Sequence, residues 1–231
     1  MNDKPECKNI MDATGDELIW LRNHRCNAHG HRYISHFNCF LREQDIKESI
    51  GILDIEATQL TAEWGYMLCY CILPLEDNPL IYNVIKPSEV RNPNKRDKRI
   101  LEQFCKDVKK FDTLIVYYGK DNPWRFDIPF LRARASKWDV AFPKANTKKV
   151  IDVYDTIKTK YKLQRKRLVN ACTWFNIPSK QTKVTPETWQ NAAAGIQEDI
   201  NKILQHCKED VWSLKELYKK VYEYKSTKSN I

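Results

Sequence analysis

The sequence predicts an α/β protein, in which a β-sheet is flanked by helices and is preceded by a small segment rich in Cys and His. Two kinds of pattern indicate the α/β class. Apolar runs of strand-forming residues lie at 51–58, 66–73, 80–85 and 113–118. Apolar residues with helical spacing lie at 98–110 and 198–224. Because residues 1–49 contain four of the five histidines and three cysteines, we expect them to form a separate N-terminal segment, followed by one domain at 50–231.

Charge is distributed unevenly between these two parts. The chain of 231 residues has a formal net charge of +9. Residues 1–49 carry 7 Lys and Arg against 8 Asp and Glu, so the whole excess belongs to the domain that follows. A basic domain suits a polyanionic partner such as nucleic acid, although a generally basic surface is also common.

Targeting signals are missing from the sequence pattern. No stretch approaches the roughly 20 apolar residues of a membrane span, so no membrane association is expected. The first eleven residues are polar and mixed in charge, unlike a signal peptide. We therefore expect a cytoplasmic protein, whose eight cysteines are reduced, metal-bound or buried.

The Cys/His segment has the spacing of a zinc site. Cys26 and His29 are separated by two residues, as are His36 and Cys39, and six residues lie between the pairs. Two short-spaced pairs of S and N donors can surround one tetrahedral zinc ion. His31 could replace His29, and Cys7 could replace any ligand. Four protein ligands would leave no open position, so the predicted Zn²⁺ is structural. The alternative is a His-rich loop that contacts phosphates or nothing.

The predicted strand at 51–58 carries two carboxylates, Asp54 and Glu56, in an otherwise apolar run. Residues two apart on a strand point to the same face. Two neighbouring carboxylates repel each other unless a cation lies between them, and Mg²⁺ prefers such oxygen ligands. The pair therefore predicts half of a metal site on a central strand. The alternative is an edge strand whose acids face water.

The middle of the chain supplies a third acid. Residues 86–99, rich in Pro, Asn and basic residues, are expected to form a loop, and 98–110 a helix. After the strand at 113–118 comes Asp127, an acid in the apolar run Phe126-Asp-Ile-Pro-Phe-Leu, at the predicted N-terminus of a helix. Asp127 could equally be a simple helix N-cap.

The last third of the chain is predicted to be largely helical. A short acidic element at 151–155 is followed by a basic, helix-like stretch at 158–167 and a helix at 168–175; 180–187 is expected to be a polar loop. The long helix from about residue 198 to 224 carries His206 and Asp210. These two residues are four apart and therefore neighbours on the helix surface.

These acids, taken together, resemble a known family. The motifs Leu53-Asp-Ile-Glu-Ala-Thr, Phe126-Asp-Ile-Pro-Phe-Leu and His206-Cys-Lys-Glu-Asp-Val are similar to those of DEDD exonucleases of the ribonuclease H-like superfamily. The second motif resembles that of the proofreading domains of family B DNA polymerases. The resemblance covers roughly residues 50–224 and implies a ribonuclease H-like mixed sheet flanked by helices. It departs at one point: the subfamilies have Tyr-x3-Asp or His-x4-Asp, whereas here His206 stands at the Tyr spacing.

The resemblance implies a metal-dependent 3′–5′ exonuclease. Two Mg²⁺ or Mn²⁺ would be held between Asp54, Glu56, Asp127 and Asp210, with His206 in the general-base position. The expected partner is nucleic acid, DNA more than RNA, with single-stranded 3′ ends. Two residues are candidates for substrate contact: Trp124, on which a base could stack although it could also be a core residue, and Lys180 in the polar loop.

Two other functions remain open at this stage. One is a structure-specific endonuclease on the same fold, which circular or end-blocked substrates would distinguish. The other is a non-catalytic, zinc-containing module that binds nucleic acid. The presence of all four acids argues against this second alternative.

Overall fold

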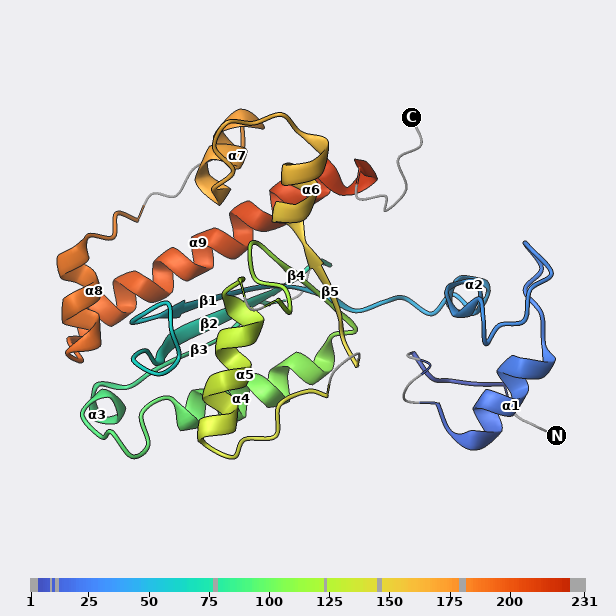
Figure 1. Ribbon diagram of the computed structural model, residues 1–231, viewed down its shortest axis with the longest axis horizontal. Helices are drawn as coiled ribbons and strands as arrows, with labels where there is room; N and C mark the ends of the chain where they lie inside the picture. Colours follow the sequence, from blue (N-terminus) through green and yellow to red (C-terminus); the bar gives the residue numbers. More distant parts are fainter. Residues whose placement is uncertain are drawn as a thin grey trace.

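The computed structural model describes the chain except for residues 1–3, 9, 11–12, 77–78, 123, 145–146, 179–181 and 225–231. Figure 1 shows the sheet with its helices and, as a separate small unit at the N-terminal end, helices α1 and α2.

The N-terminal segment has an apolar cluster of its own. Helix α1 (Gly15–Asn23) begins with a capping box, in which Oγ1 of Thr14 accepts a hydrogen bond from the Glu17 N–H and the Glu17 carboxylate accepts one from the Thr14 N–H. Helix α2 (Phe37–Glu43) follows. The buried residues of this cluster are Leu21, Cys26, Tyr33, Cys39 and Phe40. The larger cluster begins at Ile52, and this separation supports the boundary that we propose between residues 49 and 50.

A mixed five-stranded sheet forms the centre of the larger part. Its strands are β1 (Ile50–Ala57), β2 (Met67–Pro74), β3 (Ile81–Val84), β4 (Thr113–Val116) and β5 (Lys149–Asp152), in the order β3-β2-β1-β4-β5. β1, β2 and β3 pair antiparallel, whereas β1, β4 and β5 pair parallel. The parallel pairing brings the carboxyl ends of β1, β4 and β5 to one edge of the sheet. The first four strands lie where the apolar runs predicted them; β5 had no predicted assignment beyond a short acidic element.

Helices cover both faces of the sheet. The long helix α9 (Gln197–Val221) packs on β1 and β2, and α4 (Lys98–Asp107) packs on β2 and β3. In Figure 1, α9 crosses the sheet on one side, and α4 lies with α5 (Asp127–Lys137) on the other. Every residue of β2 is therefore buried, as expected for a strand with no polar alternation.

The remaining helices are short, and some differ from the prediction. They are α3 (Pro87–Val90), α6 (Val153–Lys160), α7 (Leu168–Trp174), α8 (Pro186–Ala193) and the 3₁₀ turns η2 (Val108–Lys110) and η3 (Tyr222–Tyr224). Residues 86–99 are thus not only a loop. The helix predicted at 158–167 was wrong in its bounds: α6 begins after its N-cap Asp152 and covers only residues 158–160 of the predicted range. The predicted loop at 180–187 gives way to α8 at Pro186, which Thr185 caps. No helix among the described residues has the length and apolarity that crossing a bilayer demands.

A buried ion pair fixes α5 to the loop before α4. Nη2 of Arg134 lies 2.6 Å from Oδ1 of Asp97, and both side chains are almost completely buried. Asp97 also accepts hydrogen bonds from the Met67 N–H and from Nε1 of Trp138. Because each polar atom of the pair is satisfied, this contact can hold α5 in position under the sheet.

Candidate metal centre

Strand β1 directs the first two acids toward α9. Asp54 and Glu56 pair with Cys71 and Cys69 of β2, so they lie on the same face of the sheet. The Cys207 thiol of α9 lies 3.5 Å from the backbone oxygen of Asp54, as a donor to it. This contact brings α9 directly over the carboxylate strand.

Asp127 reaches the same region from the first turn of α5. Its carboxylate lies against Gly119, in the loop that follows β4: a methyl carbon added at Gly119 would lie 1.8 Å from Oδ2 of Asp127. Only glycine leaves this space free. The N-cap of α5 is Phe126, so Asp127 is the first helical residue rather than the cap that the alternative interpretation required.

Helix α9 contributes His206 and Asp210 on one face. Nε2 of His206 lies 3.9 Å from Oε1 of Glu56 and 3.8 Å from Oδ2 of Asp210. The ligand atoms of Glu56, His206 and Asp210 all lie within 4.8 Å of one another. The structure therefore brings residues from β1 and α9, 150 positions apart in the chain, into one cluster.

The electrostatics of the cluster favour a bound cation. Burial raises the pKa of Asp54 well above its usual value, and the charges of Glu56, Asp210 and Asp127 raise it further. Burial likewise raises the pKa of Asp127 to about 8, with added contributions from Asp152 and Asp210. Like charges in a low-dielectric site disfavour the ionised forms, and a cation between them reverses that effect.

The Asp54 carboxylate has an oxygen without a donor among the described residues. Oδ2 of Asp54 is buried and accepts no hydrogen bond from any described residue. A buried carboxylate oxygen left in this way costs free energy unless a ligand satisfies it. Carboxylate oxygens are the ligands that Mg²⁺ and Mn²⁺ prefer, so the donor set fits such ions.

A second possible metal site lies in the N-terminal segment. Sγ of Cys39 lies 3.4 Å from Nδ1 of His29 and 3.5 Å from Nδ1 of His36; Sγ of Cys26 lies 3.9 and 4.0 Å from the same atoms. Tetrahedral zinc, with its usual bond lengths to S and N, sets an S to N separation of roughly 3.5 Å. The four donors therefore already have nearly the spacing of a Cys₂His₂ zinc site.

The structure groups some of the candidate ligands that the sequence left open. His29 joins the group, while His31 lies beside it with its ring centroid 4.4 Å from that of His36. Cys7 is not part of the cluster either. Glu43 fixes the ligand loop, because its carboxylate accepts hydrogen bonds from the Asn27 N–H and the Tyr33 hydroxyl.

Of the two predicted substrate contacts, Trp124 is described by the structure and Lys180 is not. Trp124 lies in the loop between β4 and α5 and is 82% exposed, so it is not a core residue. Lys180 lies outside the described residues.

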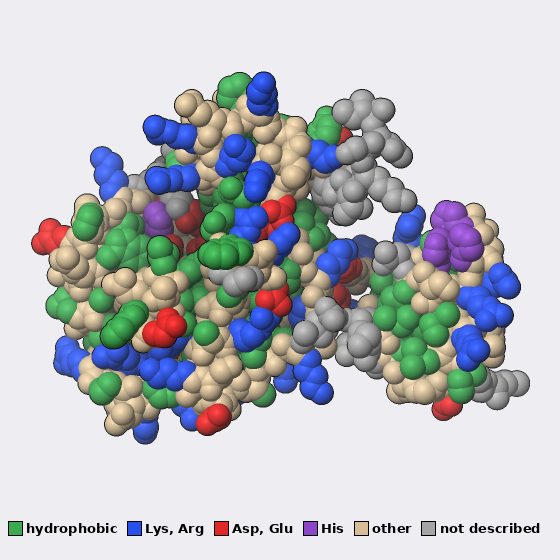
Figure 2. Space-filling view, in the orientation of Figure 1, with side chains coloured by type: hydrophobic (Ala, Val, Ile, Leu, Met, Phe, Trp, Pro, Cys, Tyr) green, Lys and Arg blue, Asp and Glu red, His purple; other side chains and the backbone are tan. Residues whose placement is uncertain are grey.

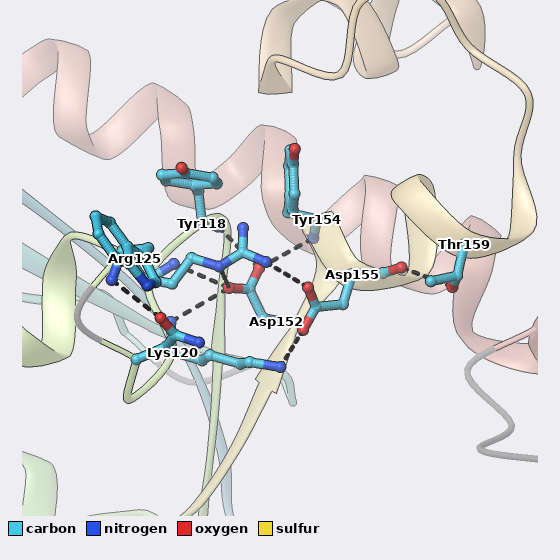
Figure 3. Close-up of polar contacts among 10 residues, drawn as sticks. Tyr118, Lys120, Arg125, Asp152, Tyr154, Asp155 and Thr159 are labelled. Carbon is cyan, nitrogen blue, oxygen red and sulfur yellow. Dashed lines mark hydrogen bonds and ion pairs between the residues drawn. The ribbon is translucent and has the colours of Figure 1, made fainter.

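Sequence reasoning missed a polar network beside the acids. Asp152, at the end of β5, accepts hydrogen bonds from the N–H groups of Tyr118, Gly119 and Lys120. Figure 3 shows Arg125 lying between Tyr118, Tyr154 and the carboxylates of Asp152 and Asp155. The signal in the sequence was an acid at the end of a short apolar run, directly before a helix.

The comparison with protein families agrees with this geometry. The chain matches a family model described as the RNase_H superfamily over residues 52–222. No curated protein matches the sequence. The matched span includes Asp54, Glu56, Asp127 and Asp210 and leaves the Cys/His cluster outside. The expected ribonuclease H-like α/β fold is thus confirmed, and the superfamily indicates nuclease activity on nucleic acid. On the evidence of its fold and of this match, the chain belongs to the RNase H superfamily.

Proposed function

We propose that the protein is a metal-dependent 3′–5′ exonuclease of the DEDD type, acting on DNA more than on RNA. The observation that carries this proposal is the buried carboxylate of Asp54. Its Oδ2 accepts no hydrogen bond from the described residues, and burial, followed by the charges of three other acids, raises its pKa. A carboxylate in this environment is explained by a divalent cation.

Asp54, Glu56, Asp127 and Asp210 would hold two Mg²⁺ or Mn²⁺. When bound, two such ions supply a lowered pKa for an attacking water and Lewis-acid stabilisation of both oxygens of an in-line displacement at phosphorus. Asp54, whose pKa is affected by the charges of all three other acids, would be the ligand shared by the two ions. Gly119 and Cys207 position the acids from the loop and from α9.

His206 would take the proton of the attacking water. Its Nε2 lies within 4 Å of oxygens of Glu56 and Asp210, and its side chain is 19% exposed. Neutral imidazole is a suitable proton acceptor near neutral pH. This proximity supports the proposal that a histidine at the Tyr spacing of the family pattern acts as the general base.

The substrate assignment rests on charge and exposure. The domain after residue 49 carries the whole positive excess of the chain, which favours a polyanion. Trp124 is exposed and three residues from Asp127, so we propose it as a stacking contact for a single-stranded 3′ end, with Lys180 as a phosphate contact.

The N-terminal segment would contribute a structural Zn²⁺ bound by Cys26, His29, His36 and Cys39. The near-tetrahedral spacing of their donor atoms supports this proposal. With four protein ligands, the ion would have no open position for chemistry.

One assay tests the nuclease proposal. Single- and double-stranded DNA and RNA, labelled at the 5′ end, are incubated with Mg²⁺ or Mn²⁺, and the products are resolved by length. A ladder that shortens stepwise from the 3′ end, present in wild type and lost in Asp54→Ala, is the expected result. Cleavage of circular DNA would identify an endonuclease instead. Binding without any metal-dependent hydrolysis would identify a non-catalytic module.

A further inference from the structure

A pocket lies beside the acidic cluster, at the carboxyl ends of β4 and β5. Its volume is about 430 Å³, within the range of small-molecule sites. Its lining residues are Tyr117, Tyr118, Tyr154, Lys166, Arg167 and Leu168. Tyr118 is adjacent to Gly119, against which the Asp127 carboxylate lies. The pocket thus begins one residue from Gly119, whose backbone the proposed metal ligand Asp127 contacts.

We propose that this pocket binds the base of an unpaired nucleotide in the single strand whose phosphodiester lies at the four acids. The proposal rests on the proposed nuclease function and adds a specific subsite to it. Tyr118 is the stacking surface, and Lys166 and Arg167 contact the neighbouring phosphate.

The aromatic wall of the pocket is held in place before any ligand binds. The Arg125 guanidinium lies 4.4 Å from the ring centroid of Tyr118 and 4.5 Å from that of Tyr154. The two tyrosine rings meet edge to face, 4.9 Å apart. Nη2 of Arg125 lies 2.5 Å from Oδ1 of Asp155, which fixes the guanidinium in turn (Figure 3). Because the rings are already ordered, a base that stacks on them loses little free energy to reorganisation.

Tyr118 occupies a costly backbone conformation. Its φ is +65°, in the left-handed region that a bulky residue rarely adopts. The Asp152 carboxylate stabilises this backbone conformation by accepting hydrogen bonds from the N–H groups of residues 118–120. The strained turn presents an aromatic side chain that is still 43% exposed. Backbone strain at an exposed aromatic residue close to the acids favours a binding role for Tyr118 over a packing role.

Part of the pocket lining is cationic. Residues 156–186 contain eight Lys and Arg and no Asp or Glu, and the pocket takes Lys166 and Arg167 from this segment. The Tyr117 hydroxyl donates a hydrogen bond of 2.6 Å to the Lys166 backbone oxygen, which anchors the segment to the end of β4. In Figure 2, Lys and Arg side chains gather over the part of the body where Figure 1 places α6 and α7. A pocket lined by aromatic rings and by the cationic residues Lys166 and Arg167 suits a nucleotide better than a neutral ligand.

This arrangement favours single strands over duplexes. A base in a duplex is stacked between its neighbours and paired, so it cannot lie on Tyr118 without being extruded. Phosphates are present in both forms, so Lys166 and Arg167 attract both.

Binding of short fluorescently labelled oligonucleotides, with no divalent ion added, tests the proposal separately from hydrolysis. Tyr118→Leu keeps a bulky side chain at the strained position but removes the ring. It should weaken binding of a single strand about 10- to 100-fold, the usual range for losing one stacked base, and leave a blunt duplex unaffected. Tyr118→Phe, which keeps the ring, should bind as wild type does. Tyr82→Leu is the matched control, because Tyr82 is similarly exposed (48%) on β3 at the opposite edge of the sheet.

Arg167→Glu tests the cationic part of the pocket lining without disturbing a buried contact, since Arg167 is exposed. It should weaken binding of single strand and duplex alike and make binding less dependent on salt. Arg91→Glu makes the same change in net charge at an exposed residue after α3, and it should bind more tightly than Arg167→Glu.

The proposal is wrong if Tyr118→Leu binds the single strand as tightly as Tyr82→Leu, or if Arg167→Glu behaves like Arg91→Glu. It is also wrong if the wild-type protein binds no single strand. Failure of the nuclease proposal has a different signature, namely binding that depends on Tyr118 without a metal-dependent product ladder.

Discussion

The carboxylate of Asp127 lies directly against the backbone of Gly119. A methyl carbon at residue 119 would lie 1.8 Å from Oδ2 and 2.7 Å from Cγ of Asp127. Gly119 follows β4 and Asp127 begins α5, so the contact fixes the distance between a strand end and a helix start. The absence of a Cβ atom at Gly119 therefore helps to position the Asp127 carboxylate.

Gly119→Ala should displace the Asp127 carboxylate and lower kcat/KM about 100-fold, the loss expected when a catalytic group moves by about 1 Å. The protein should still fold, because Gly119 is not among the residues in the left-handed backbone region. Gly15→Ala is the control, since an added methyl carbon there meets no atom within 4 Å. Equal activity of the two variants would mean that the position of Asp127 does not matter for hydrolysis.

Asp54→Asn should abolish metal-dependent hydrolysis and, without metal, raise the melting temperature. The amide has the same size but carries no charge, so it removes the repulsion from Glu56, Asp127 and Asp210. Added Mg²⁺ should then stabilise wild type more than the variant. Thermal unfolding with and without Mg²⁺ measures both effects.

Asp139→Asn serves as the control for Asp54→Asn. Asp139 is exposed and has φ of +52°, a conformation that Asn tolerates well. It should keep full activity and an unchanged response to Mg²⁺. Hydrolysis by Asp54→Asn at the wild-type rate would rule out the two-metal assignment.

His206→Ala should lower kcat by about 10²- to 10⁴-fold, the usual contribution of a general base. We expect this loss because Nε2 of His206 lies close to carboxylate oxygens of both Glu56 and Asp210. His206→Tyr should retain part of the activity, because the related subfamily has Tyr at this spacing. Titration with Mg²⁺ separates two roles: a proton acceptor changes kcat alone, whereas a metal ligand also changes the half-saturating Mg²⁺ concentration. Wild-type turnover in His206→Ala would show that the side chain only packs on the helix.

Local periodicity explains which parts of the site could be predicted. The two-residue period of β1 and the four-residue spacing on α9 each fix which side chains share a face, so Asp54 with Glu56 and His206 with Asp210 followed from sequence. The motif order then placed these pairs in one fold. Asp152 could not be found in this way, because its partners lie in the loop at 118–120, more than 30 residues earlier.

The errors in secondary structure have a similar origin. Basic residues at 158–167 have high helix propensity, but the apolar residues that anchor α6 lie before them, so the helix ends at Lys160. Helices α1 and α2 were not predicted, since their small apolar cluster is held together partly by Cys26 and Cys39, which the spacing assigned to zinc.

The N-terminal segment should contain about one zinc ion per chain after purification, measured by elemental analysis. Cys39→Ser should lose it, because Cys39 lies nearest to both histidine donors. His31→Ala should keep it, since His31 lies beside the group without belonging to it. A chelator should raise hydrogen exchange within residues 1–49 first. Zinc-free wild-type protein from zinc-replete medium would contradict the assignment.

Asp107 should make the fold more stable at neutral pH than in acid. Burial alone would raise its pKa, but hydrogen bonds from Lys110, Gln103 and Tyr70 outweigh this effect and hold the pKa below its usual value. A lowered pKa in the folded state contributes stability above the unfolded pKa of about 3.9, and this contribution is lost as the pH falls through the folded value.

Asp107→Asn should therefore cost about 1–3 kcal/mol of unfolding free energy at pH 7, the range for charged hydrogen bonds, and the difference from wild type should shrink below about pH 4. Denaturant unfolding of both proteins at each pH measures this difference, so contributions from zinc cancel. Asp121→Asn is the control: its ion pair with Arg132 is about half exposed and should contribute only about 0–1 kcal/mol. A pH-independent difference for Asp107→Asn would mean that its hydrogen bonds do not depend on the ionised carboxylate.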